Sequence, residues 1–214
     1  MRPYRGRRRF EISDPIVEPL WSGVRVMVHI DRASRPEDEP AVRVVEDLGA
    51  DLATELPALA AAIGSAVLAV DAIVDGVVSR QVGLESTGTA PIPELRTSST
   101  SMFVRNAELD VAPRGASTPD DAAEGFIAFD LLRLDGTVLV DVPLLERKRL
   151  LESVLVESDL VRRSIHVRPP IDAWIGTWRS MGLRGGILKA ANSRYRPGND
   201  SIEWRLVERV GRRG

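Results

Sequence analysis

The sequence contains no cysteine, only two histidines and no apolar run long enough to cross a membrane. The absence of cysteine excludes disulfides, a thiolate nucleophile and a thiolate zinc site. The two histidines, His29 and His166, leave little room for a histidine-rich metal site. Since no signal-peptide pattern opens the chain either, we expect a cytoplasmic protein that has no membrane contact.

Lysine is also scarce, because only Lys148 and Lys189 among the 29 Lys and Arg residues are lysine. Arginine stays protonated and is a poor nucleophile. Any lysine-dependent covalent chemistry must therefore use one of these two positions. Lys148 lies in an arginine-rich helical segment, and we expect its side chain to be exposed to solvent.

The formal net charge of −2 provides no general attraction to nucleic acid, but five of the first nine residues are arginine. We predict a basic N-terminal tail over residues 1–12. This tail either binds phosphates or is solvated and disordered. Phosphate binding would be compatible with association with the bacterial nucleoid. The arginines concerned, besides Arg2, are Arg5, Arg7, Arg8 and Arg9.

The pattern of apolar residues predicts one α+β domain over residues 13–210, followed by a short tail at 211–214. Residues 83–123 are rich in Ser, Thr, Pro, Gly and Asp, and we predict a long loop or flexible insertion there. Asp135-Gly136 predicts a hairpin turn. Strands are expected at 24–30, 42–45, 66–70, 72–80, 126–132, 137–140, 186–190 and 202–206, and helices at 57–64, 143–155 and 171–181.

Three segments resemble the adenylation domain of ATP-dependent DNA ligases, and the bacterial end-joining ligases in particular. They are E-P-L-W-S-G-V-R (18–25), F-I-A-F-D-L-L-R-L-D-G with P-L-L-E-R-K-R-L-L (126–151), and G-L-R-G-G-I-L-K-A-A-N-S-R-Y-R-P-G-N-D-S-I-E-W (182–204). A-I-V-D-G-V-V (72–78) resembles the D-G-E strand of that family. The resemblance covers residues 16–209. It implies ATP-grasp-like mixed antiparallel sheets with packed helices, and we expect no OB-fold domain in this chain.

The resemblance also implies a reaction. A lysine of these ligases attacks the α-phosphate of ATP, and the AMP then passes to the 5′-phosphate of nicked DNA. At the positions that resemble the reactive residues, this chain has others: Leu20 for the nucleophile, Ser22 for an aspartate, Val77 and Arg184 for the metal-binding glutamates, and Leu206 and Glu208 for two lysines. Leucine has no lone pair for nucleophilic attack. We therefore expect self-adenylation to be very weak or absent, and no divalent metal site.

Residues that recognise the nucleotide in the family are better preserved. The resemblance implies that Glu18 contacts the adenine amino group, Arg25 the ribose and phosphate, Phe129 the purine face, and that Lys189 closes the fourth motif. Each has a second interpretation: Glu18 as a surface carboxylate, Arg25 on the solvent side of its strand, Phe129 as a core residue and Lys189 as a charge at the rim. Arg196 is a further candidate phosphate or DNA contact.

Three functions remain open from the sequence. The first is a degenerate ligase-like protein that binds ATP or AMP, or nicked or broken DNA ends, together with a repair or regulatory partner. The second is an active ligase or nucleotidyltransferase that works with a partner or with Lys189 as its nucleophile. The third is an interaction module that keeps only the fold, with a cleft closed by Leu20, Trp21 and Val77.

Overall fold

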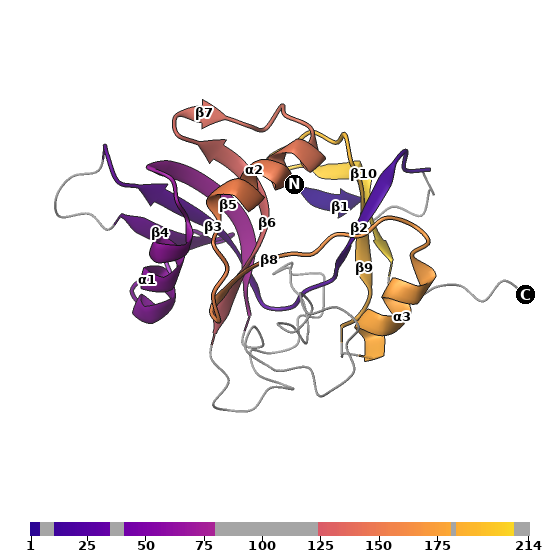
Figure 1. Ribbon diagram of the computed structural model, residues 1–214, viewed down its shortest axis with the longest axis horizontal. Helices are drawn as coiled ribbons and strands as arrows, with labels where there is room; N and C mark the ends of the chain where they lie inside the picture. The colour runs from indigo at the N-terminus through magenta and orange to yellow at the C-terminus, as the bar shows by residue number, and fades with distance from the viewer. Residues whose placement is uncertain (5–10, 35–40, 80–123, 181–182, 208–214) are drawn as a thin grey trace, which may run out of the picture.

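The fold is described from a computed structural model, and the description covers residues 1–4, 11–34, 41–79, 124–180 and 183–207 (Figure 1). The loop or insertion predicted at 83–123 lies outside these residues, as do Arg5, Arg7, Arg8, Arg9, Glu208 and the predicted tail at 211–214. The described residues form two antiparallel-rich sheets with helices packed on them, which is the α+β arrangement that the sequence predicts. None of their helices is long and apolar enough to cross a membrane.

The larger sheet has six strands in the order β4-β3-β5-β6-β7, with β8 pairing in parallel to β6. Val26, Val28 and Ile30 alternate with less buried residues along β3, so one face of the strand packs in the core. Asp135 and Gly136 both have positive φ and form the predicted hairpin turn between β6 and β7. The strands are β3 (Val24–Asp31), β4 (Val42–Glu46), β5 (Asp71–Ser79), β6 (Gly125–Leu134), β7 (Thr137–Val138) and β8 (Val161–Arg163).

The smaller sheet has four strands in the order β1-β10-β9-β2. These are β1 (Arg2–Tyr4), β2 (Pro15–Pro19), β9 (Gly186–Ala190) and β10 (Asp200–Val207). The prediction of a tail over residues 1–12 is wrong at both ends. Residues 2–4 pair in parallel with β10, and Met1 and Ile12 are buried in apolar clusters. The tertiary structure supplies a sheet edge for residues 2–4 and apolar clusters for Met1 and Ile12, and the charge pattern reveals neither.

Helices α1 (Pro57–Ala66) and α2 (Leu144–Val154) pack on the larger sheet, whereas α3 (Asp172–Ser180) packs beside β9 of the smaller one (Figure 1). Two local predictions fail in this region. Helix α1 continues past Gly64, which lies close to Val42 of β4, and residues 66–70 do not form a strand. Val67 makes a single bridge to Leu155 because both side chains pack into the core cluster of the larger sheet.

A second apolar cluster joins the two sheets. Val17 and Leu188 contribute from the smaller sheet, and Val77 and Ile127 from the larger one, with Trp178 of α3 packed among them. Burial of such large apolar side chains is the main favourable contribution to folding. This cluster holds the sheets against each other along one end of the space between them, and the functional candidates line the rest of that space.

Candidate nucleotide-binding pocket

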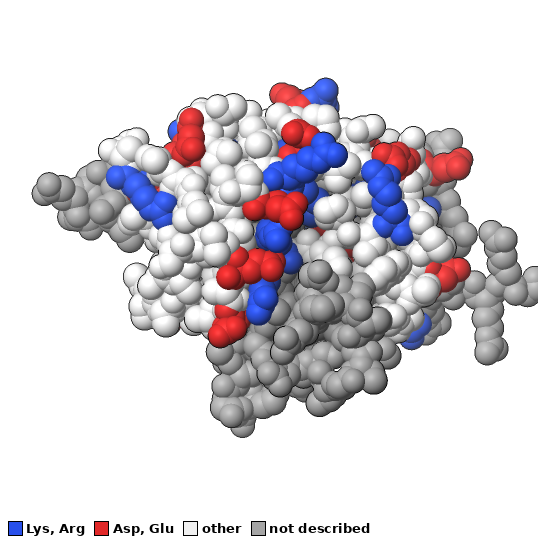
Figure 2. All heavy atoms as spheres, in the orientation of Figure 1, with Lys and Arg blue, Asp and Glu red and all other residues white. Residues whose placement is uncertain are grey.

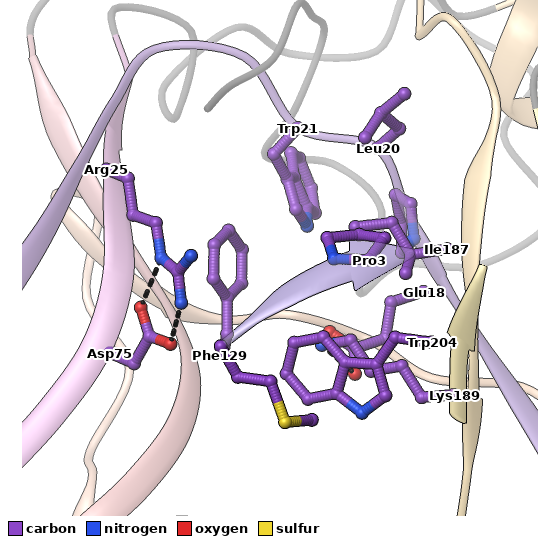
Figure 3. Close-up of a pocket in the computed structure, with 12 residues that line it drawn as sticks. Pro3, Glu18, Leu20, Trp21, Arg25, Asp75, Phe129, Ile187, Lys189 and Trp204 are labelled. Atoms are coloured by element: carbon purple, nitrogen blue, oxygen red, sulfur yellow. Dashed lines mark hydrogen bonds and ion pairs between the residues drawn. The ribbon is translucent and has the colours of Figure 1, made fainter. Parts of the chain in front are cut away.

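A pocket lies between the two sheets and gathers the four predicted recognition residues. Figure 3 shows the arrangement, with Arg25 of β3 and Phe129 of β6 on one side and Glu18 of β2 and Lys189 of β9 on the other. The remaining lining residues are Met1, Pro3, Pro19, Leu20, Trp21, Asp75, Ile187 and Trp204. Residues from seven strands and one turn therefore meet at one site, although they are spread over two hundred positions of the chain.

The turn between β2 and β3 places Leu20 and Trp21 at one end of the pocket. Gly23 has φ +137°, and a Cβ atom built there would lie 2.0 Å from the carbonyl oxygen of Val78. Only glycine fits this approach without a rearrangement of the backbone. Trp21 is further fixed because its indole N–H donates to the Ser164 hydroxyl at 2.8 Å.

Glu18 forms the centre of a buried ionic cluster. Its Oε1 atom lies 2.9 Å from the Nζ atoms of both Lys148 and Lys189. Lys148 also donates to the Phe129 carbonyl oxygen at 2.9 Å. The prediction that Lys148 is exposed to solvent is therefore wrong, since the buried face of α2 carries Arg147 and Lys148 as well as leucines. A buried carboxylate that can accept from this helix face offsets the desolvation of the ammonium group.

The protonation of this cluster follows from its contacts. Burial by itself would raise the pKa of Glu18, but the ammonium groups of Lys148 and Lys189 hold that pKa below its usual value. Burial lowers the pKa of Lys189, although the Glu18 carboxylate opposes the shift. The Lys189 ammonium lies 4.2 Å from the centroid of the Trp204 ring, which adds a cation–π contact. Lys189 is only 2% exposed, so the interpretation of Lys189 as a rim charge is wrong.

A second ionic group occupies the opposite wall. The Arg25 guanidinium donates to both carboxylate oxygens of Asp75, at 2.9 and 2.5 Å. The Tyr195 hydroxyl donates to Asp75 at 2.9 Å and accepts from Arg25 at 3.1 Å. Burial alone would raise the pKa of Asp75, but Arg25 keeps it lowered. Arg25 is buried, so the interpretation that placed it on the solvent side of its strand is wrong.

The sequence did not assign roles to several residues that shape the pocket, chiefly Asp75, Lys148, Tyr195 and Trp204. A signal existed for Asp75, because a carboxylate within an otherwise apolar strand must find a buried partner. Lys148 gave no such signal. Its position on an amphipathic helix is compatible with either face, and only the placement of Glu18 on a neighbouring strand decides between them.

The end of the pocket at which the family places its chemistry is apolar. Leu20 is 5% exposed, and Val77 is 0% exposed within the cluster that also contains Trp21 and Ile127. Arg184 is exposed and does not line the pocket. Within the described residues, no three His, Asp or Glu side chains come together as metal ligands. The side chains at this end therefore do not fit a divalent cation, which requires oxygen ligands.

The free space between the lining side chains is about 30 Å³. Met1 and Pro3 both line the pocket, and Figure 3 shows Pro3 among the side chains of Phe129, Trp21 and Trp204. A ligand of nucleoside size therefore requires these two side chains, and with them β1, to move.

The sequence matches the family described as "ATP dependent DNA ligase domain" over residues 7–205. This chain belongs to that family. The multifunctional non-homologous end joining DNA repair protein LigD of Mycobacterium tuberculosis is 27% identical over 187 residues, which cover 87% of this chain and 20% of LigD. A probable DNA ligase of Streptomyces griseus is 27% identical over 201 residues, 91% of this chain and 35% of that protein. The chain thus spans a fifth to about a third of the length of these relatives.

Solved structures agree on the fold. The ligase domain of M. tuberculosis LigD superposes with a TM-score of 0.60 at 23% identity, covering 92% of this chain and 56% of that one. A mycobacterial DNA ligase D complexed with ATP and MES gives a TM-score of 0.63 at 24% identity, covering 95% and 57%. The adenylation-domain fold implied by the sequence motifs is confirmed.

Proposed function

We propose that this chain is a DNA ligase-like adenylation domain that does not form a covalent AMP adduct at position 20 and that retains non-covalent binding of a nucleotide in a DNA repair setting. The observation that carries the proposal is the contrast between the two ends of one pocket. Leu20 and Val77 are buried apolar residues where the family has its nucleophile and a metal ligand. Glu18, Lys189 and Phe129 remain together at the other end.

The chemical argument concerns the bond that would have to form. In the family reaction an amine nitrogen donates its lone pair to the α-phosphorus, and pyrophosphate leaves with the electrons of the broken P–O bond. Leu20 has only C–H bonds, so no P–N bond can form there. Loss of an essential nucleophile typically lowers the rate by several powers of ten, and here the metal ligand is missing as well.

Lys189 is the alternative nucleophile, and its contacts argue against that role. Its ammonium group is held by Glu18 and lies over the Trp204 ring. Attack would require loss of a proton from a nitrogen whose positive charge these two contacts stabilise. Burial lowers the pKa of Lys189, but among the described residues no cluster of three His, Asp or Glu side chains lies there to hold a metal beside the amine.

Interaction with DNA ends is the weaker part of the proposal. LigD is named for DNA repair by end joining, and this chain shares the family with it. On the face shown in Figure 2, however, acidic and basic side chains alternate over α2 and β8. Pairs such as Arg149–Glu146 and Arg163–Glu152, each at 2.9 Å, neutralise one another. The described residues on this face therefore present no continuous basic patch to a duplex.

A second candidate function, an interaction module with a closed cleft, is favoured by the small free space of about 30 Å³ and by the positions of Met1 and Pro3. The two candidates differ in whether any nucleotide binds. Isothermal titration with AMP separates them: heat of binding with one site per chain supports the proposal, and no detectable binding up to millimolar AMP supports the module.

Covalent chemistry is tested by incubation with α-labelled ATP and magnesium, followed by a denaturing gel. We expect no labelled band from the wild-type chain or from Lys189→Met. A labelled wild-type band that disappears in Lys189→Met, but persists in Lys148→Met, would instead establish an active enzyme with Lys189 as the nucleophile. An active member of the ligase family serves as the positive control.

A further inference from the structure

The pocket differs in polarity from end to end, and this difference bears on which ligand it accepts. We propose that the pocket selects an uncharged purine nucleoside over a nucleoside triphosphate, and that binding does not depend on a divalent cation. This inference rests on the proposed function, because it assumes that a nucleotide-type ligand still enters. It departs from the ATP and metal that the family implies.

The apolar end would have to hold the phosphates if the nucleoside lay against Glu18 and Phe129. Leu20 and Trp21 line that end, and the buried Val77 belongs to the same apolar cluster as Trp21. A phosphate in such surroundings loses water without gaining hydrogen-bond donors or a counter-ion. The sugar and base of a nucleoside carry no such charge, so these apolar side chains lower the affinity for the triphosphate but not for the nucleoside.

The cationic side chains that line the pocket are already paired with carboxylates. Arg25 makes two hydrogen bonds to Asp75 and a third to Tyr195. Lys189 pairs with Glu18. Arg25 could turn to a phosphate only by leaving the buried Asp75 without its charged partner, which is unfavourable. A phosphate at Lys189 would lie beside the Glu18 carboxylate, whose like charge repels it. Among the described lining residues Arg25 and Lys189 are the only two cationic side chains, so phosphate binding is unfavourable on both walls of the pocket.

The polar end suits a neutral base. Glu18 offers a carboxylate acceptor and Lys189 an ammonium donor side by side, which matches the adjacent donor and acceptor on the edge of a purine. The Phe129 ring stands in the middle of the pocket in Figure 3 and offers an aromatic face. Stacking of a base on such a ring is favourable for any purine.

Entry of the nucleoside requires displacement of β1, since Met1 and Pro3 line the pocket together with Phe129 and Trp204. This strand has three residues and an irregular register against β10. Such a short edge strand is held by few hydrogen bonds, including one from the Arg2 N–H to the Asn199 carbonyl at 3.0 Å. The displacement lowers the apparent affinity of every ligand by the same factor, and it therefore does not alter the selectivity.

The test is titration calorimetry of the full chain with adenosine, AMP and ATP, each with magnesium and with EDTA. We expect adenosine to bind at least about tenfold more tightly than ATP, AMP to lie between them, and magnesium to change none of the three affinities by more than about twofold. ATP binding that equals or exceeds adenosine binding, or that strengthens with magnesium, overturns the inference but leaves the proposed function standing. No binding of any of the three refutes both.

A matched pair of variants tests whether the apolar end sets the selectivity. Leu20→Arg adds a cation there that is not a nucleophile, and it should reduce the preference for adenosine over ATP by about tenfold. Leu48→Arg adds the same charge at a position that is 81% exposed and outside the pocket, and it should leave the preference unchanged. An equal effect of both variants would refute the assignment to position 20. If Leu20→Arg does not fold, the wild-type series above still decides the inference.

Discussion

Replacement of Glu18 by glutamine would test the ionic cluster that organises the polar end of the pocket. Glutamine keeps the size of the side chain but removes the charge that Lys148 and Lys189 share. Both ammonium groups would then be buried without a counter-charge. Removal of one partner of a buried ion pair costs about 3–5 kcal/mol, and we expect the free energy of unfolding to fall by this amount. For a chain of this length the midpoint of thermal unfolding should fall by about 6–20 °C.

Two further variants provide the comparison. Lys148→Met leaves Glu18 paired one-to-one with Lys189 and removes the donor to the Phe129 carbonyl, so it should cost about 1–3 kcal/mol. Glu146→Gln makes the same chemical change as Glu18→Gln within an exposed pair, and such pairs contribute about 0–1 kcal/mol. The expected order of stability is wild type, Glu146→Gln, Lys148→Met, Glu18→Gln, measured by urea denaturation at pH 7.

The pH dependence of Glu18→Gln distinguishes an electrostatic cause from lost packing. Burial already lowers the pKa of Lys189, and without Glu18 the main opposition to that shift is gone, with only the smaller effect of Asp130 left. The unfolded chain then binds more protons than the folded chain, so the stability of the variant should rise as the pH increases from 7 toward about 10. A deficit that is independent of pH, or a loss no larger than that of Glu146→Gln, would refute the reasoning.

Three other changes have defined outcomes. The folded-state pKa values of Glu18 and Asp75 are lowered, so their ionised forms stabilise the fold above the unfolded carboxyl pKa of about 4. Urea denaturation should therefore show the free energy of unfolding falling as the pH drops below that value through their folded pKa values. Equal stability at pH 7 and pH 3 would contradict both assignments. Tyr195→Phe removes the hydroxyl that links the β9–β10 segment to Asp75, and thermal unfolding should report a loss of about 1 kcal/mol; no change would mean that this bond contributes nothing. Val77→Glu buries an unpaired carboxylate, so it should destabilise the fold by several kcal/mol. Equilibrium dialysis should detect no magnesium binding by this variant. A stable variant that binds magnesium would contradict the description of the apolar end of the pocket.

The ionic network illustrates where inference from sequence succeeds and where it stops. Glu18, Arg25, Phe129 and Lys189 were found because each falls within a motif whose order along the chain is preserved, and the structure places all four in one pocket. Their partners were not found, because pairing depends on which strands and helices become neighbours. The Lys148 side chain, for example, pairs with the Phe129 carbonyl 19 residues away along the chain and with Glu18 much farther away.

Secondary structure shows the same division. The alternation along 24–30 and the Asp135-Gly136 turn report local backbone preference, and both elements form as predicted. Residues 66–70 have strand-like composition, yet Ala66 completes α1 and Val67 packs toward Leu155 in the core. Residues 2–4 have the composition of a basic tail, yet they form a sheet edge. In both places long-range packing outweighs local propensity.

The amino-acid sequence by itself determined the family and the absence of a reactive amine at position 20, because motif order and side-chain chemistry do not depend on how the chain folds. Only the tertiary structure decided that Leu20 and Val77 are buried, that two lysines share one carboxylate, and that Met1 and Pro3 line the pocket. These facts depend on burial and on contacts between distant segments, which arise only when the two sheets pack together.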